Sequence, residues 1–377
     1  MREISFYKPS VSERESELIN EVLHTQDTTN IIDKFDNYLK QYFGAKHVIV
    51  TNNGASAHHL ALSAMQIKRG DKIICSVNAF PSIAQAIRHF DAEPIFVDIN
   101  EDDFNISPEA LEKTLKDYHH KKLKCVFVSH IAGQSAQIDE INKIAKKYDI
   151  KVLDDVNRAI GLTYNGKKIG NNEYFLSCFQ INTQVQHPIS TSGFFTTNDD
   201  EIAKQAKLLR NYALIDGIDK YGNLGYIYDV IDIGLKYDIS SLNAAYSLAQ
   251  LEKNDKFIAR RCEIAAIYNS ELAECKNITT PIKKRDHTYA QYIIKINKNR
   301  DGFARELLER GIHTSLHYIP IHLLSYYKNK YSLKVNDFPN ALKTYQQILS
   351  LPIYNELKDE EVYYICDMVK DIARSRV

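Results

Sequence analysis

The residues with the clearest chemical potential lie between Val152 and Gly193. The stretch V-L-D-D-V-N-R-A-I-G opens it and reads as a buried strand with Asp155 at its carboxyl end. The stretch Q-H-P-I-S-T-S-G closes it and reads as a loop. No lysine occurs between Lys168 and Lys204, so this loop offers the imidazole of His187 but no amine.

Asp155 needs a partner because burying an uncompensated carboxylate is costly. One partner is the protonated ring nitrogen of pyridoxal phosphate, whose role as an electron sink requires such a carboxylate. The plainer interpretation is a strand-end cap or a bond to Arg158. Asp155 taken alone favours the plainer one.

A second candidate is the turn N-N-G-A-S-A, from Asn52 to Ala57. It follows the apolar run His47 to Thr51 and precedes a helical pattern that stops at Gly70. A strand, a small-residue turn and a helix together point backbone N–H groups at an anion, usually phosphate. An ordinary helix cap explains the turn equally well.

Aromatic and histidine side chains supply further candidates. Phe80 follows an apolar strand and could stack on an aromatic ring or fill the core. His317 and His322, in H-Y-I-P-I-H, fit catalytic bases, metal ligands or structural residues. No third ligand accompanies them, so we predict no metal site.

Apolar strands alternating with helical segments must position these residues. This alternation predicts an α/β fold with a parallel sheet covered on both faces. Ligands of such sheets bind at the carboxyl ends of the strands. Residues 53–56, Ala79, Phe80, His130 and Asp155 fall at those ends.

The length of 377 residues exceeds one compact core. We therefore expect a large domain over residues 1–250 and a smaller α+β domain over residues 251–377. The smaller domain is predicted from these strands and helices: Tyr289–Ile296, Thr314–Tyr318, Gly302–Arg310, Asn340–Leu349 and Asp359–Ala373. Residues 216–228 read as a Gly/Tyr/Asp-rich loop that is either mobile or used in assembly.

Composition excludes several classes of protein. The 48 basic and 48 acidic side chains balance, which gives no reason to expect nucleic acid as a partner. No run approaches 18 apolar residues, so no membrane partner is expected, and the N-terminus lacks the apolar core of a signal peptide. We expect a cytoplasmic protein whose six cysteines, without any CxxC spacing, stay reduced and bind no zinc.

Several motifs, in order and spacing, resemble the DegT/StrS family of sugar-nucleotide aminotransferases over essentially the whole chain. They include N-N-G-A-S-A-H-H-L-A-L (52–62), N-A-F-P-S-I-A-Q-A (78–86), L-D-D-V-N-R-A-I-G (153–161), A-A-Y-S-L-A-Q-L-E-K (244–253) and G-I-H-T-S-L-H-Y-I-P-I-H (311–322). The resemblance implies a fold type I pyridoxal-phosphate transferase with a mostly parallel seven-stranded sheet. It also implies a homodimer with a shared active site, a nucleotide-linked keto sugar as substrate and an amino donor such as glutamate.

The resemblance also assigns roles to residues. Gly54 and Ala55 would offer N–H groups to the cofactor phosphate, and Phe80 would stack on the pyridine ring. Asp155 would pair with the ring nitrogen, and Arg158 falls near the ring hydroxyl, where the family usually has Gln or His. His317 and Tyr318 would contact the substrate.

Four departures from the family pattern matter. The I-S-T-S-G match (189–193) places His187 at the reactive lysine, whereas an ungapped count from T-N-D (197–199) places Val185 there. The phosphate-binding serine becomes Gln180 or Asn182, depending on the same gap. Lys236 replaces an asparagine that reaches the partner subunit's cofactor phosphate, and Asp238 replaces an arginine. Ala55 replaces the turn threonine.

Without a lysine, pyridoxal or pyridoxamine 5'-phosphate would bind noncovalently, and His187 would move the proton during catalysis. A small branch of the family, sugar 3-dehydratases, carries this histidine. Two alternatives stay open. Lys236 could supply an amine from the partner subunit, or the protein could be an inactive relative with a binding or regulatory role.

Overall fold

The computed structural model describes residues 2–118, 120–171, 174–181, 188–216 and 227–375. Its centre is a seven-stranded sheet in the order β1-β9-β8-β5-β4-β2-β3. Only β9 runs antiparallel, to both β1 and β8, so the predicted mostly parallel sheet is confirmed. The strands are β1 His47–Thr51, β2 Lys72–Ser76, β3 Glu93–Val97, β4 Leu123–Ser129, β5 Lys151–Asp155, β8 Leu176–Ile181 and β9 Ser192–Thr197.

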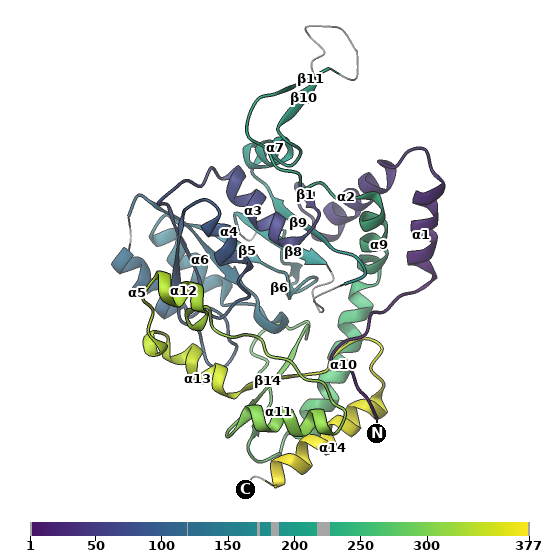
Figure 1. Cartoon of the computed structure of the whole chain (residues 1–377), viewed down its shortest axis with the longest axis vertical. Coiled ribbons are helices and arrows are strands. Elements are labelled where there is room, and N and C mark those ends of the chain that lie inside the picture. The colour runs from purple at the N-terminus through teal and green to yellow at the C-terminus, as the bar shows by residue number, and fades with distance from the viewer. Residues whose placement is uncertain (1, 119, 172–173, 182–187, 217–226, 376–377) are drawn as a thin grey trace.

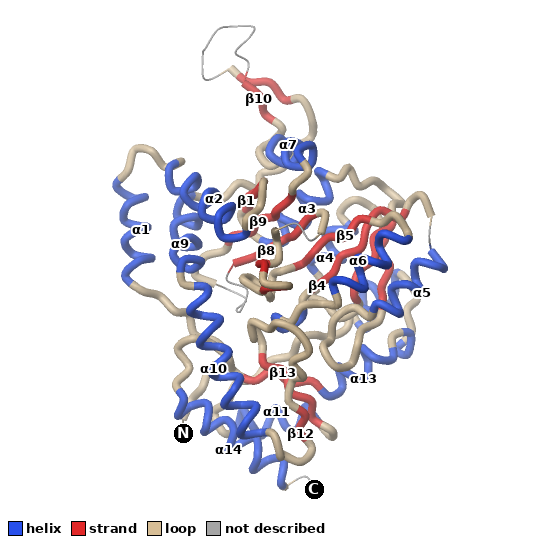
Figure 2. Tube along the Cα trace, turned by 180° about the vertical axis from the view of Figure 1, so that it is seen from behind, coloured by secondary structure: helices blue, strands red, loops and turns tan. Residues whose placement is uncertain are grey.

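Helices cover both faces of this sheet. Successive strand residues point to opposite sides, and both sets are apolar here, so each face needs a covering layer. Val126 and Val152 face one core, and their neighbours Phe127 and Leu153 face the other. Figures 1 and 2 show the two layers from opposite sides. The first face packs against α2 Asn30–Phe43, α5 Pro108–Tyr118, α6 Ile138–Lys147 and α9 Ser241–Glu252, and α1 Glu13–His24 packs on α9. The second face packs against α3 Gly54–Ala64, α4 Ser82–Arg88 and α7 Asp200–Leu209.

A smaller antiparallel sheet, β12-β13-β14, forms a third core with the C-terminal helices. Ile4 joins this core and bonds to Gly311, so the N-terminal segment runs beside the C-terminal unit. The elements are β12 Ile278–Thr279, β13 Tyr292–Ile296, β14 Ile348–Leu351, α10 Asn254–Leu272, α11 Arg300–Glu309 and α14 Asp359–Arg374. The domain division at residue 250 stays a prediction.

One expected element of this unit is wrong, and another is present but ends two residues early. Residues 314–318 form no strand, only an isolated bridge between Ser315 and Ser350. The helix expected over residues 340–349 is α13, Pro339–Gln347, and the chain then enters β14. Pairing of β14 with β13 overrides the helical pattern of residues 348 and 349.

A hairpin arm, β10 Leu214–Asp216 paired with β11 Tyr228–Val230, extends away from the body (Figure 1). The two strands flank the predicted loop over residues 216–228 and include its first and last residues. Residues 217–226 fall outside the described residues. The remaining elements are β6 Thr163–Tyr164, β7 Lys167–Lys168, α12 Ser325–Lys330 and the 3₁₀ turns η1 Ile131–Gly133, η2 Ile321–Leu323 and η3 Val335–Asp337. Over the described ranges, no helix has the length and apolar character needed to span a membrane.

Candidate functional site

The turn between β1 and α3 presents open N–H groups at the carboxyl edge of the sheet. The Asn53 side chain caps α3 by accepting a hydrogen bond from the Ser56 backbone N–H at 2.9 Å. No described residue accepts a bond from the N–H groups of Gly54 or Ala55, which lie in the first turn of α3. Such free donors at the positive end of a helix favour an anion.

Close packing around this turn requires two glycines. A Cβ on Gly54 would lie 2.5 Å from the Gln180 Cβ, and a Cβ on Gly193 would lie 2.2 Å from the Asn53 carbonyl carbon. Gln180 pairs with Gly193 across β8 and β9. The antiparallel strand β9 therefore holds the turn in place and brings Gln180 against Gly54.

Asp155 ends β5 next to this turn. Its carboxylate accepts hydrogen bonds from the Ser129 hydroxyl at 3.1 Å and the Asn157 N–H at 3.3 Å. Burial acts to raise its pKa, but nearby His58 and these hydrogen bonds outweigh burial and hold the pKa below its ordinary value. Asp155 is therefore an ionised carboxylate in a mostly buried position, suited to a cationic partner.

His58, which the sequence analysis did not single out, lies close to this carboxylate. It lies on α3, one turn after Gly54, and its side chain is fully buried. Its Nε2 lies 3.5 Å from Asp155 Oδ1, and the ring packs edge-on against Phe127. The available signal was a histidine on the otherwise apolar helix face of Ala61 and Leu62.

Three further candidates come together beside Asp155. Phe80 is 62% exposed, and its ring centre lies 6.2 Å from that of Tyr318. The Arg158 Nε donates a hydrogen bond to the Tyr318 hydroxyl at 3.1 Å. An aromatic face, a guanidinium and a phenol thus line the same region.

The two candidate histidines of the 311–322 motif, His317 and His322, are buried. His317 is hydrogen-bonded to the Ser350 hydroxyl at 2.8 Å, and burial, with the nearby Arg158 charge, lowers its pKa to about 3. His322 Nε2 donates to the Val335 carbonyl at 3.1 Å. Both histidines are held by contacts within the protein. The side chain of this motif that lies near Phe80 is therefore that of Tyr318, not that of His317.

Lys236 lies in a segment beside the β1–α3 turn, because the Tyr237 carbonyl accepts a bond from the Asn52 N–H at 2.9 Å. Its ammonium pairs with Asp238 at 2.9 Å and with the Asn211 side chain at 3.2 Å. The charges of Lys236 and Asp238, the two residues that depart from the family pattern here, therefore neutralise each other within one chain. His187 and Asn182, and Val185 of the alternative alignment, lie outside the described residues.

The site as described can therefore hold an anion at the turn and a cationic ring nitrogen at Asp155, with an exposed aromatic face nearby. Residues 9–370 match the model of the DegT/DnrJ/EryC1/StrS aminotransferase family. Protein MJ1066 of Methanocaldococcus jannaschii is 34% identical, covering 97% of each chain. The spore coat polysaccharide biosynthesis protein SpsC of Bacillus subtilis is 31% identical, covering 91% of this chain and 90% of SpsC.

The fold also matches solved structures. Spr1654 from Streptococcus pneumoniae, in its PMP-form, superposes with a TM-score of 0.91 at 22% identity. The match covers 99% of this chain and 100% of that chain. The predicted α/β fold of pyridoxal-phosphate aminotransferases is therefore confirmed.

Proposed function

Because the chain belongs to the DegT/DnrJ/EryC1/StrS aminotransferase family, we propose that it modifies a nucleotide-linked keto sugar with pyridoxal or pyridoxamine 5'-phosphate as cofactor. The similarity to SpsC supports a role in polysaccharide or glycan biosynthesis. The PMP-form of Spr1654, which shares the fold, supports the cofactor class. One observation carries the proposal: free N–H donors at the turn and an ionised, mostly buried Asp155 lie at the same edge of the sheet.

The residues present fit this cofactor. Gly54 and Ala55 would hold its phosphate with their unbonded N–H groups, and the Gln180 side chain lies beside them. Asp155 would keep the ring nitrogen protonated, and the exposed Phe80 would cover the ring. When bound, the cofactor supplies an electron sink for proton transfer next to its amine carbon.

The missing lysine makes the binding noncovalent in this proposal. His187 would accept and return the proton at the cofactor C4' carbon, since imidazole titrates near neutral pH. Transfer of the amine to the sugar would give an amino sugar, with glutamate restoring the amine of the cofactor. If a neighbouring sugar hydroxyl left as water after the same proton removal, these residues would serve a dehydration.

We also infer a cytoplasmic homodimer with a shared active site. The hairpin arm and the segment after it expose apolar side chains, including Tyr228, Val230, Ile231 and Ile233. Ile233 is 88% exposed, and a projecting arm of this kind needs a covering surface. A second copy would provide it and would bring Lys236 toward the neighbouring cofactor phosphate.

The test replaces His187 with alanine. We expect turnover of a panel of nucleotide-linked keto sugars to fall by a factor of ~10² to 10⁴, the usual contribution of a general acid–base. Binding of pyridoxamine phosphate, followed by absorbance, should survive. His24→Ala, at an exposed helix end, is the matched control and should change neither quantity. Unchanged turnover in His187→Ala would contradict the assignment.

A further inference from the structure

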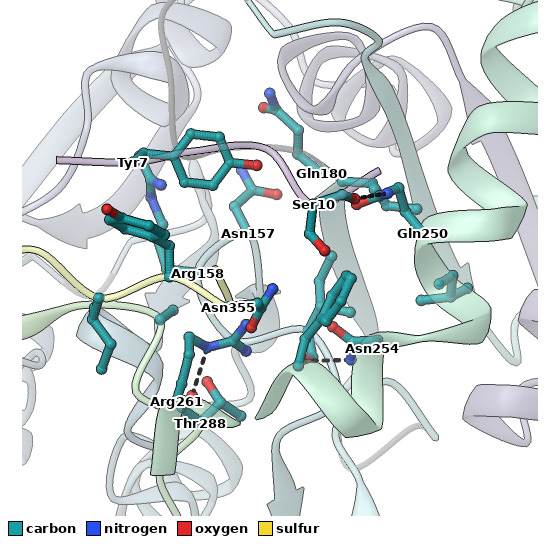
Figure 3. A pocket seen from close by; sticks show the side chains of 17 residues that line it. Tyr7, Ser10, Asn157, Arg158, Gln180, Gln250, Asn254, Arg261, Thr288 and Asn355 are labelled. Carbon is teal, nitrogen blue, oxygen red and sulfur yellow. Dashed lines mark hydrogen bonds between the residues drawn. The ribbon is translucent and has the colours of Figure 1, made fainter. Parts of the chain in front are cut away.

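A cavity of about 110 Å³ lies beside the candidate site, between the carboxyl edge of the large sheet and the C-terminal unit (Figure 3). Arg158 and Gln180 line it from the sheet side, and Tyr7 lines it from the N-terminal segment. Arg261 of α10 and Asn355 line the opposite side. Neither Gly54 nor Ala55 is among the described lining residues, but Gln180, which packs against Gly54, is one of them, so the cavity adjoins the anion-binding turn.

The described lining of this cavity carries two guanidinium groups and no Asp or Glu. Arg261 Nε donates to the Thr288 carbonyl at 3.0 Å, and no described carboxylate lies within ion-pair distance of Arg261. Burial lowers the pKa of Arg261 to about 10, which leaves it a cation at neutral pH. A cation that is partly removed from water and has no counter-charge is costly unless a ligand supplies one.

Three acidic side chains near the lining residues are already paired. Glu15 binds Lys253, Asp255 binds Lys168, and Glu356 accepts a bond from Ser10. None of them is positioned to neutralise Arg261. The described chain therefore supplies no carboxylate within ion-pair distance of Arg261.

Two other lining groups are also unsatisfied. The Tyr354 hydroxyl and the Asn355 Oδ1 are buried without a hydrogen-bond partner. Buried polar groups normally have partners, so these two indicate a place for polar ligand atoms. The volume is several times the ~15 Å³ that one water molecule needs, enough for a small charged group.

We propose that the cavity between Arg158 and Arg261 binds the carboxylate or phosphate group of a small-molecule substrate. The inference rests on the proposed function because it takes the ligand to be a substrate that reacts at the neighbouring cofactor. A guanidinium binds either group with charge-assisted, paired hydrogen bonds. A carboxylate would belong to the amino donor, and a phosphate to the nucleotide of the sugar substrate.

The experiment is isothermal titration of the full chain, saturated with pyridoxamine phosphate, with inorganic phosphate and separately with glutarate. We expect at least one probe to bind, and Arg261→Met to weaken it by about tenfold or more through loss of charge-assisted bonds. Arg261→Lys, which keeps the charge, should retain part of the affinity. Stronger binding of glutarate assigns the cavity to the amino donor, and stronger binding of phosphate assigns it to the nucleotide.

Arg260→Met is the matched control, since Arg260 lies on the same helix and pairs with Glu263 and Asp359. It should leave both affinities unchanged, and thermal unfolding without ligand checks that each variant is folded. Absence of binding by either probe, or equal binding by wild type and a folded Arg261→Met, overturns the proposal. Competition between the probes and pyridoxamine phosphate also overturns it, because the anion would then occupy the cofactor site.

The cofactor absorbance band, recorded in parallel, separates this proposal from the proposed function. A normal band without anion binding overturns only the cavity assignment. Anion binding that depends on Arg261 in a protein without any cofactor band supports the cavity and contradicts the proposed function.

Discussion

At the scale of the residue, Asp155 determines whether the site suits a cationic ring nitrogen. Its depressed pKa means that the folded state favours the carboxylate more than the unfolded chain does. The resulting stability is present above the unfolded pKa of ~3.9 and is lost as the pH falls through the lower folded value.

We therefore expect Asp155→Asn to be less stable than wild type near neutral pH, with a deficit that shrinks below about pH 4. Urea unfolding at several pH values measures the difference. Ser129→Ala, which removes one donor to the same carboxylate, should give a smaller change of the same sign. A deficit that does not vary with pH would contradict the assigned charge.

The buried histidines predict a second pH effect of the same sign. Burial lowers the pKa of both His287 and His317 to about 3. The unfolded chain takes up protons near pH 6.5, so each group costs at most ~1.4 kcal/mol of unfolding free energy per pH unit below that value. We expect His317→Gln to have a shallower loss of stability between about pH 6 and pH 4. Equal slopes in wild type and variant would contradict a buried, neutral His317.

At the scale of the element, β9 and the β1–α3 turn act together. Gly193→Ala would place a Cβ 2.2 Å from the Asn53 backbone, so either the turn or β9 must move. Overpacking of this kind typically costs ~1–3 kcal/mol. We expect that loss together with weaker binding of pyridoxamine phosphate, measured by thermal unfolding and absorbance titration.

Gly166→Ala is the control for this change. Nothing lies within 4 Å of a Cβ there, although its φ of +78° favours glycine. It should lose about 1 kcal/mol through backbone strain and keep its cofactor affinity. Similar loss of affinity in both variants would show that the turn is not specifically involved.

Local patterns predicted most elements because strands β1 and β2 and helices such as α9 are defined by their own apolar periodicity. The position of β9 was not predictable, since its pairing with β1 and β8 joins segments far apart in the chain. The same holds for site residues. Gly54, Phe80 and Asp155 stand in local sequence motifs and could be predicted. The approach of His58 to Asp155, and the absence of a described carboxylate near Arg261, depend on tertiary packing.

At the scale of the whole molecule, the exposed hairpin arm predicts self-association. Ile233→Glu would put a charge into the proposed interface, where burying it is unfavourable. We expect wild type to sediment as a dimer and this variant to dissociate at least tenfold more readily. Ile282→Glu, an exposed apolar position in the C-terminal unit, should remain dimeric. A monomeric wild type would contradict the shared site.

The central claim is that this member of an aminotransferase family uses its cofactor without a covalent link to lysine. The most direct measurement adds pyridoxal phosphate to the purified protein, records the near-ultraviolet and violet absorbance, reduces with borohydride and then determines the intact mass. We predict a protein-bound absorbance band and an unchanged protein mass after denaturation. A mass increased by one reduced cofactor would contradict the claim, and Lys236 would be the first lysine to examine by peptide mapping.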